Sequence, residues 1–150
     1  MKKTVLWLCA VTVALTSCVN LVPSNTVAPT ENEGSYTYTY RLSKVLQIDP
    51  LNTSGIDIKS YFDWFDSYSL TVYVENGKYA YCEVNTGDIP FNPYGFQLPA
   101  GKQPCSLDNS VSPMAIRLSS GEVLARYRQG QFVVPFQLDC SDISYEFWFK

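Results

Sequence analysis

The last third of the chain carries a run of turn signals that constrains the fold more than any other feature. Turns at Ser120-Gly121, at Gln129-Gly130 and over 139–142 divide residues 114–149 into four antiparallel strands. The implied partners are Val123–Phe136, Ala125–Val134 and Tyr127–Phe132 on one strand pair, and Leu138–Ile143, Phe136–Tyr145, Val134–Phe147 and Phe132–Phe149 on the next. All three turns place the apolar side chains on one face, which a register wrong by one residue would not do. We therefore predict a C-terminal four-strand meander.

Residues 69–84 predict a separate hairpin. Asn76-Gly77 suits a two-residue type I′ turn, because both residues accept a positive φ. The turn pairs Glu75 with Lys78, Val74 with Tyr79, and Val72 with Tyr81. One face then carries Leu70, Val72, Val74, Tyr79 and Tyr81, and the other carries Thr71, Tyr73, Ala80 and Cys82.

The remaining segments complete a β-rich pattern. Residues 36–42 alternate between apolar and polar side chains and predict a strand. Helical spacing of Ile58, Tyr61, Phe62 and Phe65 behind a capping Asp57 predicts one short helix. Residues 85–113 contain five prolines and no periodicity, which predicts a long loop. We predict an all-β fold with minor α content over residues 36–150, an antiparallel β-sandwich or small open barrel of about seven strands.

The N-terminus has the features of an export signal. Lys2 and Lys3 precede an apolar stretch from Val5 to Leu15, which is shorter than the roughly 20 residues of a membrane-spanning helix. The stretch ends in Leu15-Thr16-Ser17-Cys18, which resembles the lipobox of bacterial lipoprotein precursors. The resemblance implies a signal peptide over 1–17 and a lipid attached to Cys18, which becomes the first residue. In that family an Asp after the cysteine typically retains the protein at the inner membrane, so Val19 favours the outer membrane of a Gram-negative host.

Residues 18–35 then form the acylated cysteine and a flexible linker. This segment shows no periodicity and would span roughly 20–25 Å as a coil. Removal of Lys2 and Lys3 with the signal leaves 9 basic and 14 acidic residues, a net charge of −5. Anionic lipid would repel such a surface, so the acyl chains (palmitate and related fatty acids) are the expected membrane anchor. We expect the periplasmic leaflet rather than the cell surface.

Three cysteines remain in the predicted mature domain, and none belongs to a CxxC motif. An oxidising compartment favours one disulfide. We favour Cys105–Cys140, because one lies in the proline-rich loop and the other in a turn, where the backbone can adjust. Cys82 lies inside a predicted strand and reads as a small buried side chain. The two pairings that include Cys82 stay open.

The composition excludes several classes of function. The chain has no histidine, which excludes a Ser–His–Asp triad, a Cys–His pair and an HExxH zinc site. An acidic pI near 4.8 gives no reason to expect nucleic-acid binding. The carboxylates that could form a catalytic pair have simpler explanations. Asp57, Asp139 and Asp142 are better explained by capping and turn formation, and Asp63 and Asp66 would lie on the polar side of the predicted helix. We predict a non-enzymatic protein with neither a cofactor nor a metal site.

Two groups of side chains are candidates for binding. The meander register places Leu124, Arg126, Val133 and Trp148 on its outer face, together with Pro135. Such a face either contacts a partner, since Trp and Arg are common anchors, or is covered by another element of the chain. The alternating Tyr36, Tyr38 and Tyr40 either stack on sugar rings or form the core face of their strand.

These observations lead to a ranked set of functions. The first is an outer-membrane-anchored lipoprotein that binds an envelope protein partner or assists envelope assembly. The second is a lipoprotein that binds glycan or peptidoglycan through exposed tyrosines. The third is an inhibitor or exclusion lipoprotein that acts through the 85–113 loop.

Overall fold

The computed structural model describes residues 34–87 and 96–150. The predicted signal peptide, Cys18 and most of the predicted linker lie outside the described residues. Within those residues no helix is both long enough and apolar enough to cross a membrane.

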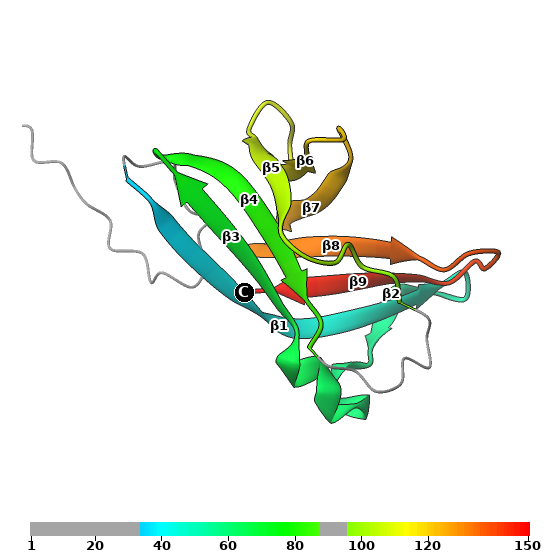
Figure 1. Ribbon diagram of the computed structural model, residues 1–150. Coiled ribbons are helices and arrows are strands. Elements are labelled where there is room, and N and C mark those ends of the chain that lie inside the picture. Colours follow the sequence, from blue (N-terminus) through cyan, green and yellow to red (C-terminus); the bar gives the residue numbers. More distant parts are fainter. Residues whose placement is uncertain (1–33, 88–95) are drawn as a thin grey trace, which may run out of the picture.

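The described chain folds into a nine-stranded antiparallel sheet, eight strands of which close into a barrel (Figure 1). The strands are β1 Tyr36–Asp49, β2 Asn52–Asp57, β3 Ser69–Glu75, β4 Lys78–Asn85, β5 Gln103–Asp108, β6 Ala115–Leu118, β7 Val123–Arg128, β8 Gln131–Gln137 and β9 Ser144–Phe149. They follow the order β2-β1-β3-β4-β5-β6-β7-β8-β9, and β9 also pairs with β1. The prediction of an all-β antiparallel fold is confirmed. The sheet is a closed barrel with one added strand, rather than a sandwich or an open barrel of about seven strands.

Strand β1 closes the barrel because it is long enough to pair twice. Its first half, Tyr36–Arg41, pairs with β3, and its second half pairs with β9. Arg41 and Lys150 exchange two backbone hydrogen bonds of 2.9 Å each at the changeover. The register shifts there, and Ser43 donates a hydrogen bond to the Trp148 carbonyl at 3.0 Å. Pairing both edges in this way satisfies backbone groups that an open sheet would expose.

The order of the predicted meander is confirmed as β6 to β9, but the β7–β8 register covers only Arg126–Arg128 and does not include the predicted pairs Val123–Phe136 and Ala125–Val134. Phe132 lies opposite both Tyr127 and Phe149, and Val134 lies opposite Phe147. The inward side chains Phe132, Val134, Phe147 and Phe149 are all buried in the core. One shift occurs between β6 and β7, where Ile116 lies opposite Ala125 but Arg117 lies opposite Val123. This β-bulge leaves Leu124 without a partner and decides where its side chain lies.

The hairpin β3–β4 follows the prediction only next to its turn. Glu75 lies opposite Lys78 and Val74 opposite Tyr79, and Asn76 and Gly77 both have positive φ, of 53° and 75°. Beyond these pairs β4 contains a bulge at Ala80, so Tyr73 lies opposite Tyr81 and Val72 opposite Cys82. The predicted Val72–Tyr81 pair is therefore wrong. Cys82 and Val84 are buried in the core, and Tyr81 is on the outer face.

The predicted loop over 85–113 contains a barrel strand, β5, which pairs with β4 and β6. Phe96, upstream of β5, is buried against Phe147 and Tyr145, with ring centroids 5.1 and 4.8 Å away. The loop prediction is wrong over this part, because barrel closure requires a strand that has little β-propensity of its own. Residues 88–95 lie outside the described residues.

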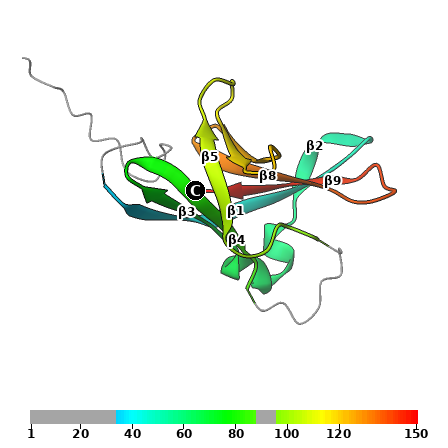
Figure 2. The same cartoon turned by 45° about the horizontal axis from the view of Figure 1, so that its top comes forward.

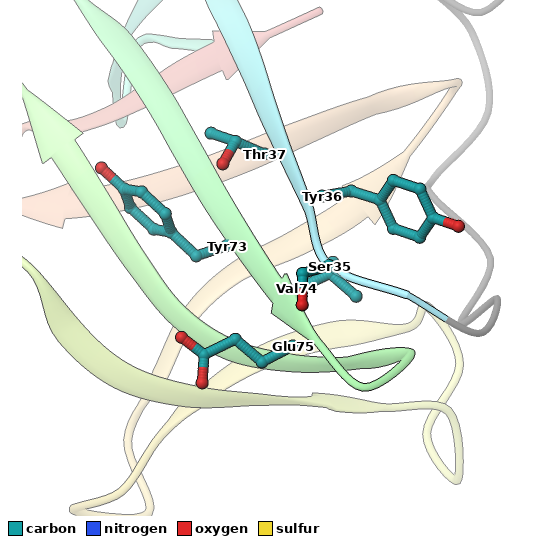
Figure 3. Close-up of a pocket in the computed structure, with 6 residues that line it drawn as sticks. All are labelled: Ser35, Tyr36, Thr37, Tyr73, Val74 and Glu75. Atoms are coloured by element: carbon teal, nitrogen blue, oxygen red, sulfur yellow. The ribbon is translucent and has the colours of Figure 1, made fainter.

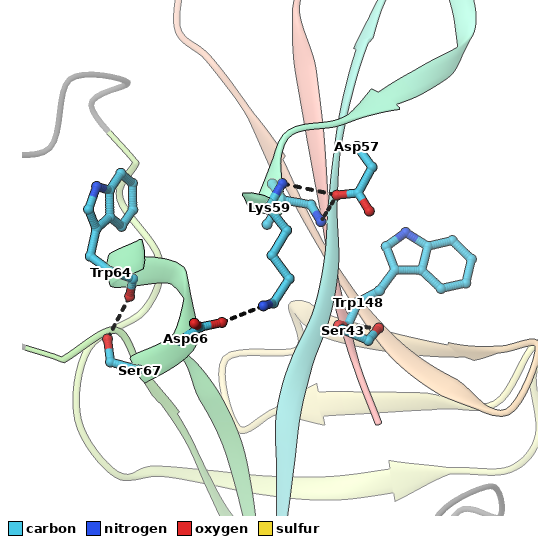
Figure 4. Close-up of polar contacts among 8 residues, drawn as sticks. Ser43, Asp57, Lys59, Trp64, Asp66, Ser67 and Trp148 are labelled. Carbon is cyan, nitrogen blue, oxygen red and sulfur yellow. Dashed lines mark hydrogen bonds and ion pairs between the residues drawn. The ribbon is translucent and has the colours of Figure 1, made fainter. Parts of the chain in front are cut away.

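Two short 3-10 helices replace the predicted helix: η1 Lys59–Tyr61 and η2 Asp63–Ser67. An extended Phe62, with φ −144° and ψ 124°, separates them. The N-cap position of η1 is Ile58 and not the predicted Asp57. The Asp57 Oδ1 accepts hydrogen bonds from the backbone of Lys59 and Val45 at 3.0 and 3.1 Å and so joins this segment to β1 (Figure 4). Ile58 and Phe65 are buried as the spacing predicts. Figures 1 and 2 both show these turns at one end of the barrel.

Candidate binding surface

A row of side chains crosses four strands on the outer wall of the barrel. Arg126 on β7 lies opposite Val133 on β8, which lies opposite Trp148 on β9. The row continues to Lys44 on β1. Val133 and Trp148 are only 2% and 5% exposed, although they lie outside the interior core cluster. The three outward positions read from the sequence are thus neighbours, and the fold adds Lys44.

Long cationic side chains of the same sheet cover Trp148. The Lys44 ammonium lies 3.8 Å from the centre of its ring, and the Arg128 guanidinium carbon lies 5.0 Å from it. The Trp148 Nε1–H donates a hydrogen bond of 3.0 Å to Glu146, whose other carboxylate oxygen pairs with Arg128 at 2.5 Å. The indole therefore forms the floor of a charged surface.

Leu124 does not belong to this surface. The bulge between β6 and β7 turns its side chain inward, and it is 4% exposed within the interior core cluster. Its prediction as an outer-face binding residue is corrected. A bulge shifts the alternation by one residue, and the sequence pattern contains no signal for it.

Beside Trp148 lies a hollow of about 170 Å³, lined by Arg126, Arg128, Val133, Pro135 and Glu146. Arg126 is exposed and forms no ion pair with any residue that the structure describes. The Nε of Arg128 is buried and has no hydrogen-bond partner among those same residues. A guanidinium presents donors in a planar fork that fits a carboxylate. The hollow can therefore receive an anionic group above an apolar floor.

We call this surface the Trp148 patch. It consists of Lys44, Arg126, Arg128, Val133, Pro135, Glu146 and Trp148. Three of its side chains are basic and one is acidic, whereas the predicted mature chain has a net negative charge.

The predicted tyrosine stripe divides between core and surface. Tyr40 is buried and packs edge-on against Phe132 at 5.2 Å, Tyr38 is half-buried, and Tyr36 is 42% exposed. Tyr36 borders a polar hollow of about 180 Å³ with Ser35, Thr37, Tyr73, Val74 and Glu75 (Figure 3).

A different tyrosine pair, Tyr73 and Tyr81, lies side by side on the outer face of β3–β4. The Lys102 ammonium lies 4.1 Å from the ring centre of Tyr73 and 4.5 Å from that of Tyr81. It occupies the position at which a sugar ring would stack on these two residues.

The cysteines do not form the predicted Cys105–Cys140 disulfide, since Cys82, Cys105 and Cys140 are all free. Cys105 lies on β5 and packs against the core, whereas Cys140 is exposed in the β8–β9 turn. The side chains of Cys105 and Cys82 are hydrogen-bonded to each other. This bond, with burial, raises the pKa of Cys105, and the same bond lowers the pKa of Cys82 against the opposing effect of burial. The sequence places Cys105 in a predicted loop and therefore does not predict its contact with Cys82.

Two of the candidate carboxylates, Asp57 and Asp66, have contacts that indicate structural roles. Asp57 accepts a hydrogen bond from the Lys59 backbone, and Asp66 pairs with the Lys59 side chain at 2.5 Å (Figure 4). Over residues 34–87 and 96–150, no three histidine, cysteine or acidic side chains gather as a metal ion requires.

Comparisons of the chain with protein-family models, with curated proteins and with solved structures find no match.

Proposed function

We propose that this chain is a lipoprotein anchored to the outer membrane whose barrel binds an envelope protein without catalysing a reaction. The anchor is the lipid on Cys18, inferred from the lipobox-like Leu15-Thr16-Ser17-Cys18. The binding surface is the Trp148 patch. The partner contributes an acidic side chain next to an apolar one.

The observation that carries this proposal is the environment of Arg126. Its guanidinium is exposed and forms no ion pair within the described residues, and it lies beside the hollow over Val133 and Pro135. Charged patches favour complementary partners and accelerate their encounter. A buried aromatic floor with an arginine at its rim is a common composition for an anchor site.

The other two candidate functions have less support. Lys102 covers the Tyr73–Tyr81 pair, so a glycan would have to displace a cation from both rings. The 85–113 segment contributes Phe96 to the core and residues 103–108 to the barrel, which limits what could insert into another protein.

Site-specific photo-cross-linking tests the binding surface. A photoreactive residue at Pro135, in the full chain on intact cells, is expected to yield one discrete protein adduct. Arg126→Glu should abolish it by placing like charges together, whereas Lys78→Glu, an equal charge reversal in the β3–β4 turn, should not. A photoreactive residue at the exposed Thr39 is the positional control. Equal adducts from both positions, or an adduct unaffected by Arg126→Glu, would refute the proposal.

Acyl labelling tests the anchor separately. Cys18→Ser should abolish incorporation of labelled fatty acid and leave the protein unprocessed or soluble. Continued labelling and membrane fractionation of this variant would remove Cys18 from the proposal.

A further inference from the structure

The contact between β4 and β5 is the shortest strand pairing in the barrel. Its register comprises two pairs, Tyr81 with Pro104 and Cys82 with Gln103, whereas β8 and β9 share six. Pro104 has no backbone N–H to donate to the ladder. Fewer backbone pairs therefore join β4 to β5 than join the other neighbouring strands of the barrel.

Two thiols meet at this seam. Cys82 on β4 is fully buried, and Cys105 is the residue after Pro104 on β5. Both side chains belong to the interior, and a hydrogen bond joins them. Both strands also lie next to each other in the two views of the barrel (Figures 1 and 2).

We propose that Cys82 and Cys105 form a disulfide that fastens β4 to β5. The electrons go to an external disulfide of the oxidising envelope, so the physiological setting rests on the export that the proposed function includes. Two S–H bonds and the external S–S bond break, one new S–S bond forms, and the external disulfide leaves as two thiols.

The exposure of the two residues sets the order of the exchange. Cys105 is half-buried whereas Cys82 is fully buried, so an external disulfide reaches the Cys105 sulfur first. The raised pKa of the Cys105 thiol makes this the slow step, in which Cys105 loses its proton and forms a mixed disulfide as one external thiol leaves. The Cys82 thiolate, which the hydrogen bond favours, then attacks the Cys105 sulfur and releases the second thiol. The product places a covalent bond between β4 and β5, whose register comprises only two pairs.

Oxidation of the purified full chain tests the pairing. After incubation with excess oxidised glutathione and blocking of free thiols, peptide mass spectrometry should find Cys82 linked to Cys105 and Cys140 blocked. The oxidised protein should unfold on the order of 10 °C above the reduced one, the size expected for a loop-closing disulfide. Cys105→Ala should remove this shift, and Cys140→Ala should keep it.

Cys82→Ala should also remove the shift. If this buried substitution prevents folding, Cys105→Ala alone provides the test. Recovery of Cys82, Cys105 and Cys140 all as blocked thiols, or of a linkage to Cys140, would overturn the pairing. Thiol trapping in intact cells addresses the compartment alone. A pair that oxidises in glutathione but stays reduced in cells would contradict the proposed export and the physiological disulfide, while leaving the pairing of the two sulfurs correct.

Discussion

The barrel has two walls that are alike inside and different outside. On the hairpin wall, β3–β4, the interior holds Val72 and Val74, and the outer face carries Tyr73 and Glu83, joined by a 3.2 Å hydrogen bond. On the meander wall, β8–β9, Phe147 fills the interior, whereas the outer face buries Trp148 beneath cationic side chains. One wall is buried on one face and the other on both.

This difference in burial explains why the apolar–polar alternation is clear in the sequence of one wall and weak in that of the other. Alternation is clear in 70–74 because every second side chain is in contact with water. It is weak in 132–134, where three successive side chains are buried. A strand that loses its alternation thus marks a wall with a second buried layer, and this layer carries the Trp148 patch.

The largest expected effect concerns the interior of the meander wall. Phe147→Ala should lower the free energy of unfolding by about 3–5 kcal/mol, because the side chain is fully buried against Tyr68 and Phe96. Urea denaturation would measure it. A loss below about 1 kcal/mol would contradict the position of Phe147 in the core.

The second largest effect is expected on the outer faces of the two walls, where the same kind of substitution should cost different amounts of stability. Trp148→Ala should cost about 3 kcal/mol, since it removes a buried ring. Tyr73→Ala on the half-buried hairpin surface should cost about 1 kcal/mol or less. Paired denaturation curves compare the two variants. Equal losses would show that the two outer faces are not distinct.

Alkaline pH tests the burial of Tyr68 in the barrel interior. Burial raises the pKa of Tyr68 to about 12. Its contribution to stability is complete below pH 10, where neither state ionises. It is lost as pH rises toward 12, because the unfolded chain then releases a proton that the folded one retains. Tyr68→Phe should weaken the decline in melting temperature between pH 10 and 12, and an unchanged decline would count against a buried Tyr68.

The smallest expected effect concerns the covering cations. Lys44→Ala should cost about 0.5–1 kcal/mol, because it uncovers a buried indole. Lys102→Ala, the matched change on the hairpin wall, should lower the free energy of unfolding by less, because the rings of Tyr73 and Tyr81 are already partly exposed to solvent. Urea midpoints at constant slope measure both. A larger loss for Lys102→Ala would reverse the proposed contrast.

Prediction from sequence succeeded where local chemistry determines the pairing. The turns at 129–130 and 139–142 set the β8–β9 register, and the neighbours Arg126, Val133 and Trp148 follow from it. It failed at Leu124 and Tyr81, where bulges change the facing of a side chain without a local signal. Cys105 was misplaced because its strand forms only once β4 and β6 lie on either side.

The sequence by itself determined the all-β class and the β8–β9 register, because turn residues and alternation act over a few positions. Tertiary structure decided that the sheet closes, that Lys44 and Arg128 cover Trp148, and that Cys82 meets Cys105. Each of these contacts joins residues far apart in the chain. Their partners depend on the closure of β1 against β9 and of β4 against β5, which no local pattern encodes.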